Sequence, residues 1–192
     1  MSSSVNTRQA ILRAASGLFA RQGFKKTSMD EIAKLAHVGK GTIYEAFQSK
    51  EDLFATIIRD ESETLLDRLS QTMSREAEPE AKVRAFVVNR MASLRDTANL
   101  HQITDEALLE LLPLANEARQ IYFDRELALL ADALDEGKRQ GDFDLDESRS
   151  VALAILSALT GLETVLLRIS SPVRLEHGIQ VAMDIFLRGL RR

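Results

Sequence analysis

Cysteine and tryptophan are absent from this 192-residue chain, and proline occurs only three times. Without cysteine the chain can form neither a disulfide bond nor a thiolate metal site, which fits a reducing compartment such as the cytoplasm. Hydrophobic residues make up 45% of the chain and aromatic residues only 5%. A proline-poor composition rich in leucine and alanine, both strong helix formers, predicts an all-α protein.

Long uninterrupted hydrophobic runs are also missing. The most apolar stretch, residues 151–169, contains Ser157, Thr160, Glu163 and Arg168, so we expect a buried helix there and not a membrane span. Residues 1–20 lack the apolar core of a signal peptide. The sequence therefore predicts a cytoplasmic protein without a membrane span or a signal peptide.

Acidic residues are scarce in the first 50 residues, whereas acidic residues outnumber basic ones in the rest of the chain. Residues 1–50 contain eight Lys or Arg and three Asp or Glu, whereas the remaining residues contain 17 basic and 26 acidic side chains. A basic N-terminal segment on an acidic body favours a polyanionic partner at that end. The alternative is an ordinary solvated surface, because a modest excess of positive charge is common.

Four helices are predicted in the first third of the chain, of which the second and third are short. Apolar residues at helical spacing predict a first helix that ends at Gly23. A capping-box pattern at residues 28–31 begins a second, and a third is expected at about 40–47. Ser49 caps a long fourth helix. Two short helices joined by about four residues are typical of a helix-turn-helix motif, here at about 28–47, with His37 in the left-handed conformation of the turn.

Helical periodicity continues to the end of the chain and gives about nine helices in all. We expect an N-terminal domain at residues 5–65 and a helical bundle at 66–192. In the bundle, expected helix boundaries are Pro79 at a start, Pro113 and Lys138 at ends, Gly137 and Gly141 as breakers, and Asp144 or Asp146 as a cap.

The segment Gly39–Thr42 combines glycine, lysine and a hydroxyl group, which together suit phosphate. A nucleotide-binding P-loop needs a glycine five residues before the Gly-Lys pair and a preceding strand. Here Lys34 takes that position, and a helix precedes it. The spacing therefore excludes a P-loop and favours the phosphate backbone of DNA.

One dense set of positions matches a known pattern: Gly23, Phe24, Thr27, Ile32, Ala33, Ala36, Val38, Lys40, Gly41, Thr42, Tyr44, Phe47, Ser49, Lys50, Glu51 and Leu53. In these positions the chain resembles the TetR family of bacterial transcriptional regulators. The resemblance implies a cytoplasmic bacterial protein that associates with the nucleoid when bound to DNA. Three positions depart from the family's pattern: His37 replaces the usual turn glycine, Gly39 replaces a capping serine, and Glu45 stands where many members have an aromatic residue or histidine.

The resemblance implies a homodimer that binds a double-stranded DNA operator, with the third helix of each subunit in the major groove. For Ser28 the alternative role is that of a simple helix cap, and for Tyr44 it is packing within the protein. The residues to which the resemblance assigns DNA contacts are Thr27, Ser28, Lys40, Gly41, Thr42, Tyr44 and Lys50.

The resemblance also implies that the bundle binds a small-molecule effector that relieves repression, and that its last two helices form the dimer interface. Ordinary core packing is the alternative for the apolar candidates. Candidate effector ligands are Phe86, Met91, His101, Thr104, Leu108, Tyr122 and Phe123. Candidate interface residues are Leu159, Leu162, Leu166, Met183, Ile185 and Phe186.

Two other functions are alternatives for this sequence. One is a DNA-binding protein of the same fold that takes its signal from a protein partner. The other is an enzyme on a helical bundle, but none of the three histidines has a partner three or four residues away, and no nucleophile–base or metal constellation is present. We therefore expect no enzymatic activity, no cofactor and no metal.

Overall fold

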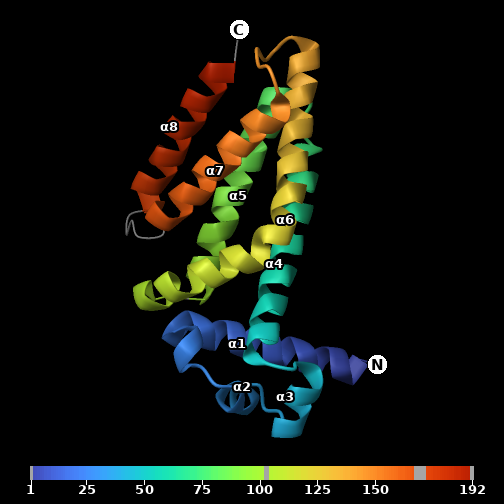
Figure 1. Ribbon diagram of the computed structural model, residues 1–192, viewed down its shortest axis with the longest axis vertical. Coiled ribbons are helices and arrows are strands. Elements are labelled where there is room, and N and C mark those ends of the chain that lie inside the picture. Colours follow the sequence, from blue (N-terminus) through green and yellow to red (C-terminus); the bar gives the residue numbers. More distant parts are fainter. Residues whose placement is uncertain (1, 102–103, 167–171, 191–192) are drawn as a thin grey trace. The chain divides into compact units, whose positions relative to one another are not determined.

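The computed structural model describes residues 2–101, 104–166 and 172–190. The elements of these residues are all helices (Figure 1), so the all-α prediction is confirmed. They are α1 (Ser2–Lys26), α2 (Met29–Leu35), α3 (Lys40–Ala46), α4 (Lys50–Met73), α5 (Pro79–His101), α6 (Asp105–Gln140), α7 (Ser148–Leu166) and α8 (Pro172–Leu190).

The helices divide into two compact units that are not contiguous in sequence. The first unit comprises Met1–Ser62 and Thr97–Gln120, and the second comprises Glu63–Asp96 and Ile121–Arg192. The three boundaries, at residues 62/63, 96/97 and 120/121, fall within α4, α5 and α6, so each of these helices contributes to both units. The sequence predicted a single domain boundary, between residues 65 and 66. In the structure residues 97–120 also belong to the first unit, because contacts between residues distant in sequence decide which unit a segment joins.

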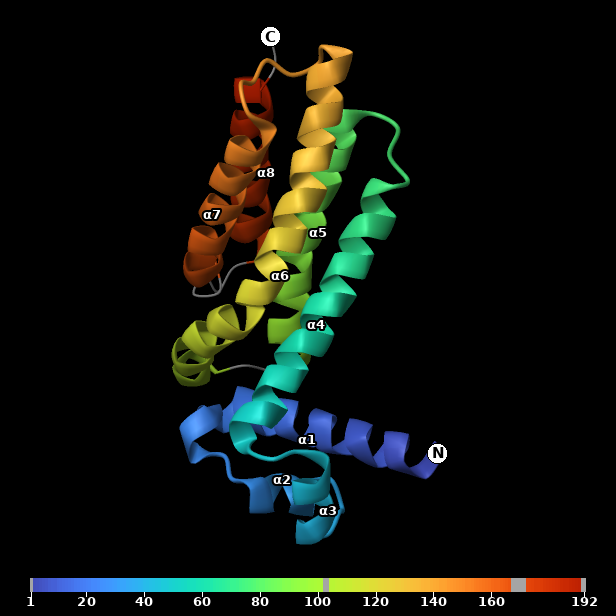
Figure 2. The same ribbon diagram turned by 45° about the vertical axis from the view of Figure 1, so that its right-hand side comes forward.

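The core of the first unit joins α1, α2, α3, the first turns of α4 and part of α6. Three phenylalanine rings, Phe19, Phe24 and Phe54, lie 5.4–5.6 Å apart between centroids, a spacing that favours tilted and edge-on contacts. Ile43 and Phe47 bury the inner side of α3 in the same cluster. Figure 2 shows α2 and α3 as short helices beneath the long α1. This shared core holds α3 in place.

Side chains cap the starts of α2 and α4 as the sequence predicted. Ser28 and Glu31 form a reciprocal capping box at α2. At α4 the Asp52 amide donates to Ser49 Oγ at 3.1 Å, and the Asp52 carboxylate accepts from the Gln48 amide at 3.0 Å. Both motifs satisfy amide groups that a helix start otherwise leaves unpaired.

His37 ends α2 in the left-handed conformation, with φ of 55°. The Val38 amide donates to the Ala33 carbonyl at 3.0 Å and the His37 amide to the Lys34 carbonyl at 3.2 Å. This pair of bonds is a Schellman motif, which normally takes glycine at the left-handed position. The predicted conformation of His37 is confirmed.

The second unit is a bundle built from α7, α8 and the parts of α4, α5 and α6 that belong to it. Figures 1 and 2 both show α7 and α8 side by side, and buried residues of both helices belong to one apolar cluster. Inside it, Arg90 Nε donates to Glu126 Oε2 at 2.7 Å, and Arg90 Nη2 donates to Thr160 at 3.3 Å. No helix among the described residues is both long and apolar enough to span a membrane.

Three predicted boundaries in this part of the chain were wrong, and the described helices number eight instead of about nine. Helix α6 continues through Pro113, an exposed position where water can satisfy the carbonyl group that proline leaves unpaired. Gly137 lies inside α6. Glycine is required there because a Cβ atom would lie 2.2 Å from Cδ2 of the Phe143 ring. Helix α7 begins at Ser148, after both aspartates that were expected to cap it.

Replacing His37 with glycine should stabilise the protein. A left-handed conformation costs a residue with a Cβ atom about 1 kcal/mol, which glycine does not incur, so the free energy of unfolding should rise by about that amount. His37→Ala is the matched control, because it removes the imidazole but keeps the Cβ atom, and it should give no such gain. Urea denaturation of both variants provides the measurement, and equal stabilisation by both would show that backbone conformation is not the cause.

Candidate nucleic-acid interface

The outward face of α3 consists of residues that contribute little to the protein's own packing. Lys40, Gly41, Tyr44 and Glu45 are exposed, and Tyr44 keeps 47% of its surface accessible although it is a large aromatic residue. Thr42 is half-buried beside them. These positions follow helical spacing, so they form one continuous face.

Two glycines at the start of α3 have no structural reason within the described residues. Gly39 has a φ of −70°, which any residue adopts, and caps α3 without a side-chain hydrogen bond. A Cβ atom at Gly41 would meet nothing within 4 Å, and glycine inside a helix costs about 1 kcal/mol relative to alanine. The space above this helix start therefore suits the close approach of another molecule.

Lys40 already has an acidic partner. Its Nζ atom lies 2.9 Å from Asp30 Oδ2, and both side chains are exposed. The hydrogen bond to Asp30, followed by the attraction of its charge, raises the pKa of Lys40. An exposed ion pair contributes little stability, so Lys40 can exchange Asp30 for a phosphate group at small cost.

Thr27 lies in the α1–α2 turn, by which we mean residues 23–28, from the Gly23 interruption near the end of α1 to the N-cap of α2. Lys50, the first residue of α4, reaches this turn with its ammonium group. Lys50 Nζ donates to the carbonyl oxygens of Phe24 and Thr27, at 2.7 and 2.8 Å, and lies 4.4 Å from the Phe24 ring centroid. Thr27 is 2% exposed, and its hydroxyl donates to the Gly23 carbonyl at 2.8 Å. In this arrangement Lys50 holds the turn with two of its three N–H groups, and the buried Thr27 hydroxyl is engaged within the same turn.

The Ser28 hydroxyl is engaged in the capping box. It donates to Glu31 Oε2 at 2.8 Å and accepts from the Glu31 amide at 3.3 Å. The hydrogen bond from the Ser28 side chain, then that from its backbone, lowers the pKa of Glu31. The structure therefore brings Lys40, Gly41, Thr42 and Tyr44 together on α3 and gives Ser28 a local structural contact.

Sequence reasoning did not single out Arg8. Its guanidinium carbon lies 4.7 Å from the centroid of the Phe47 ring, and Phe47 is the C-cap of α3. The contact adds a cation–π interaction between the first turns of α1 and the end of α3. Nothing in the local pattern signals it, because 39 positions separate the two residues.

The predicted effector residues fall into different surroundings. Phe86, Met91 and Tyr122 are buried in the second unit, and Phe123 packs against the same cluster. The Tyr122 hydroxyl lies 3.4 Å from a carboxylate of that unit. Thr104 instead belongs to the first unit, where its hydroxyl caps the start of α6 by accepting from an amide at 3.2 Å. The side chains of His101 and Leu108 lie outside the described residues.

The predicted interface residues also divide. Leu159 and Met183 are buried in the core of their own subunit, and Leu162 and Phe186 are partly buried against it. Ile185 is 65% exposed. The side chain of Leu166 lies outside the described residues. No group of residues that suits a metal ion occurs in the described part of the chain.

Comparison with known proteins identifies the family. A family model described as bacterial regulatory proteins, tetR family, matches residues 11–57. The uncharacterized HTH-type transcriptional regulator YfiR of Bacillus subtilis (strain 168) is 31% identical over 145 residues, which are 71% of this chain and 68% of that protein. The chain belongs to the TetR family. It is thus related to DNA-binding transcription regulators and not to enzymes.

Other TetR-family likenesses agree. The uncharacterized HTH-type transcriptional regulator YhgD of Bacillus subtilis (strain 168) is 38% identical over 101 residues, 53% of this chain, and the match spans about half of that relative (51%). The solved structure of the regulator FadR from Bacillus subtilis in complex with stearoyl-CoA superposes with a TM-score of 0.72. The two sequences are 21% identical, and the superposition covers 95% of this chain and 99% of the FadR chain. This likeness shows a shared fold.

Replacing Gly41 with alanine should stabilise the protein and weaken its binding to DNA. The added methyl group meets no protein atom and raises helix propensity by about 1 kcal/mol, yet it occupies the space that DNA would approach. Gly17→Ala in α1 is the matched control, since its methyl would meet only the end of the Arg21 side chain at 3.4 Å. Urea denaturation and DNA titration of both variants test this, and unchanged DNA affinity in Gly41→Ala would contradict it.

Proposed function

We propose that this chain is an effector-relieved transcriptional repressor that binds a pseudo-palindromic operator as a homodimer. The observation that carries the proposal is the outward face of α3, where two glycines without a structural reason flank Lys40. Each subunit would place the start of α3 in the major groove, as a helix-turn-helix motif does. Two subunits related by a two-fold axis then match the two halves of the operator.

The residues of this face suit different parts of DNA. Lys40 would bind a phosphate or a guanine edge, and Tyr44 would donate its hydroxyl hydrogen to a phosphate. Thr42 would contact a thymine methyl group or a phosphate, while Gly41 allows the backbone of α3 to approach. Lys50 contributes mainly by holding the α1–α2 turn, with one N–H group remaining for a phosphate.

A second copy of the chain is the partner proposed for α7 and α8. Leu153, Val181 and Ile185 are large apolar residues that stay exposed on these helices. Apolar side chains on two neighbouring helices are expected to be buried when subunits associate. We therefore centre the proposed interface on the exposed residues Ile185 and Val181 of α8. They take the place of the core residues Leu159 and Met183.

The effector is proposed to be a small molecule with a large apolar part. The candidates in the second unit, Phe86, Met91, Tyr122 and Phe123, are apolar or aromatic, as ligand sites mostly are. The FadR structure with stearoyl-CoA makes a long-chain acyl thioester the first compound to test. The effector must bind the DNA-incompetent conformation more tightly than the DNA-competent one, because only differential affinity shifts a population. We place the protein in the cytoplasm.

Selection of DNA from a random-sequence library tests the repressor proposal. The unmodified protein should enrich one duplex with two related half-sites, because a dimer reads the same bases twice. If the dimer neutralises two phosphate groups, raising the salt concentration from roughly 50 to 200 mM should lower its affinity for DNA by about tenfold. Failure to enrich any duplex, or affinity that does not change with salt, would contradict DNA reading by α3.

A charged residue at Ile185 should prevent dimer formation without unfolding the subunit. Ile185 is 65% exposed in one subunit, so Ile185→Glu is tolerated there, but the carboxylate would be buried without a partner in the interface. Ile121→Glu is the matched control, because Ile121 is 71% exposed in the same unit but lies on α6. Analytical ultracentrifugation should show monomers for the first variant and dimers for the second. A dimeric Ile185→Glu protein would place the interface elsewhere.

A further inference from the structure

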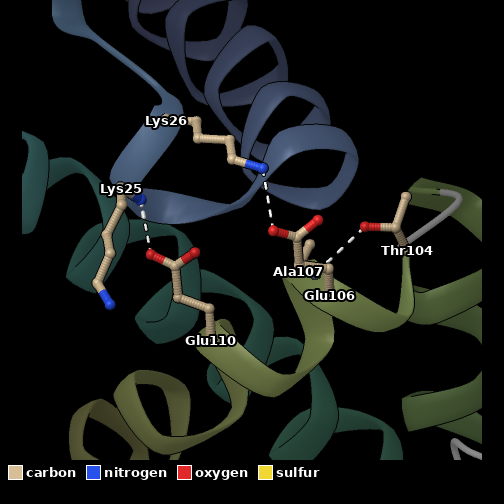
Figure 3. Close-up of polar contacts among 6 residues, drawn as sticks. All are labelled: Lys25, Lys26, Thr104, Glu106, Ala107 and Glu110. Atoms are coloured by element: carbon tan, nitrogen blue, oxygen red, sulfur yellow. Dashed lines mark hydrogen bonds and ion pairs between the residues drawn. The ribbon is translucent and has the colours of Figure 1, made fainter.

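Two carboxylates near the start of α6 contact the end of α1, far away in sequence. Glu110 Oε1 accepts a hydrogen bond from the Lys25 amide at 2.7 Å, and Glu106 Oε1 lies 3.0 Å from Lys26 Nζ (Figure 3). The Thr104 amide donates to the Ala20 carbonyl at 3.1 Å. All these residues belong to the first unit, so this stretch of α6 is part of the DNA-binding unit although the family model ends at residue 57.

The two carboxylates differ in what they hold. Glu106 pairs with an exposed, flexible lysine side chain, an interaction that contributes little. Glu110 binds a backbone amide, and its second oxygen occupies the space of an absent side chain: a Cβ atom at Gly23 would lie 2.5 Å from Glu110 Oε2. Gly23 has a φ of +84°, which interrupts the helical path of α1. Glu110 therefore fits the backbone at this interruption.

The backbone that Glu110 holds leads directly into the DNA-reading helices. The α1–α2 turn, residues 23–28, contains the end of α1 beyond the Gly23 interruption and the two residues before α2. Lys50 binds two carbonyl groups of this turn. The turn ends at Ser28, the N-cap of α2. Because α2 and α3 share one core with α1, a shift of this turn would move the start of α3.

We propose that Glu110 is a positioning residue for DNA reading, which acts by accepting the Lys25 amide at the Gly23 interruption. This inference rests on the proposed DNA-binding function. Glu110 would not touch DNA; its contact keeps the α1–α2 turn in the shape that aims α3. A negative charge in a DNA-binding unit opposes a polyanion, so an effect of charge alone has the opposite sign to an effect of positioning.

Two substitutions separate reach from charge. Glu110→Asp keeps the charge but shortens the side chain by one methylene, so the carboxylate no longer reaches the Lys25 amide. Glu110→Gln loses the charge but keeps a carbonyl oxygen at the same reach. We expect Glu110→Asp to bind the duplex selected by the unmodified protein about tenfold more weakly, the lower end of the effect of losing a hydrogen bond to a charged group. Glu110→Gln should bind it nearly normally.

Binding to a random-sequence duplex of the same length provides the second measurement. A misplaced α3 should weaken selective binding and leave non-selective binding unchanged, because the phosphate contacts of non-selective binding need no exact register. Glu106→Gln, which removes a neighbouring exposed carboxylate, is the control and should change neither. Hydrogen exchange of the Lys25 amide should accelerate in Glu110→Asp and stay slow in Glu110→Gln.

Several results would overturn the inference. Full selective affinity in Glu110→Asp would do so, as would an equal loss in Glu110→Gln. An equal loss of selective and non-selective binding with a lowered melting temperature would reduce Glu110 to a stabilising residue. If the unmodified protein selected no duplex at all, the proposed function would fail first, whereas the exchange rate of the Lys25 amide would still report on the Glu110 contact.

Discussion

The ammonium group of Lys50 lies between the carbonyl oxygens of Phe24 and Thr27, and the geometry of the first unit depends on the turn that it holds. The buried Thr27 hydroxyl closes the same turn from within by binding the Gly23 carbonyl. Glu110 binds it from α6 through the Lys25 amide. Groups from α4, from α6 and from the turn itself thus fix one short connection, and α2 begins directly after it.

Helix α3 has little stability of its own. It contains seven residues, one of which is glycine, and it follows a second glycine that provides no side-chain cap. A helix this short does not form alone in water, so the buried side chains of Ile43 and Phe47 must hold it against the core. The outer face is consequently free of any packing role, and its residues are available for contact with DNA.

Local features of the fold could be predicted from the sequence, because they depend on residues a few positions apart. The capping box at Ser28, the Ser49 cap of α4 and the left-handed conformation of His37 are of this kind. Gly137 was predicted as a helix breaker, because the sequence does not indicate that the chain folds back and packs the Phe143 ring, six positions later, against this glycine. The membership of residues 97–120 in the first unit depends on contacts across some 80 positions and has no local signal.

The same distinction applies to the candidate site. Lys40, Gly41 and Tyr44 could be named from the sequence through the resemblance to the TetR pattern, and helical spacing places them on one exposed face of α3. A family pattern identifies important positions, but it does not say whether a side chain points inward. Thr27 and Lys50 match the pattern, and the structure places their polar groups in contacts of the α1–α2 turn. The partner of Lys40, Asp30, was missed because the two helices meet only in the folded chain.

The central claim is that DNA occupies the open space at the start of α3, and glycine amides provide the most direct measurement. The chain has nine glycines, so a protein labelled with ¹⁵N-glycine gives a small set of amide signals. On saturation with the selected duplex, the Gly39 and Gly41 signals should shift strongly, and the signal of Gly137, buried beside Phe143, should stay in place. Unchanged Gly39 and Gly41 signals at saturation would contradict the account, because DNA would then be bound by another surface.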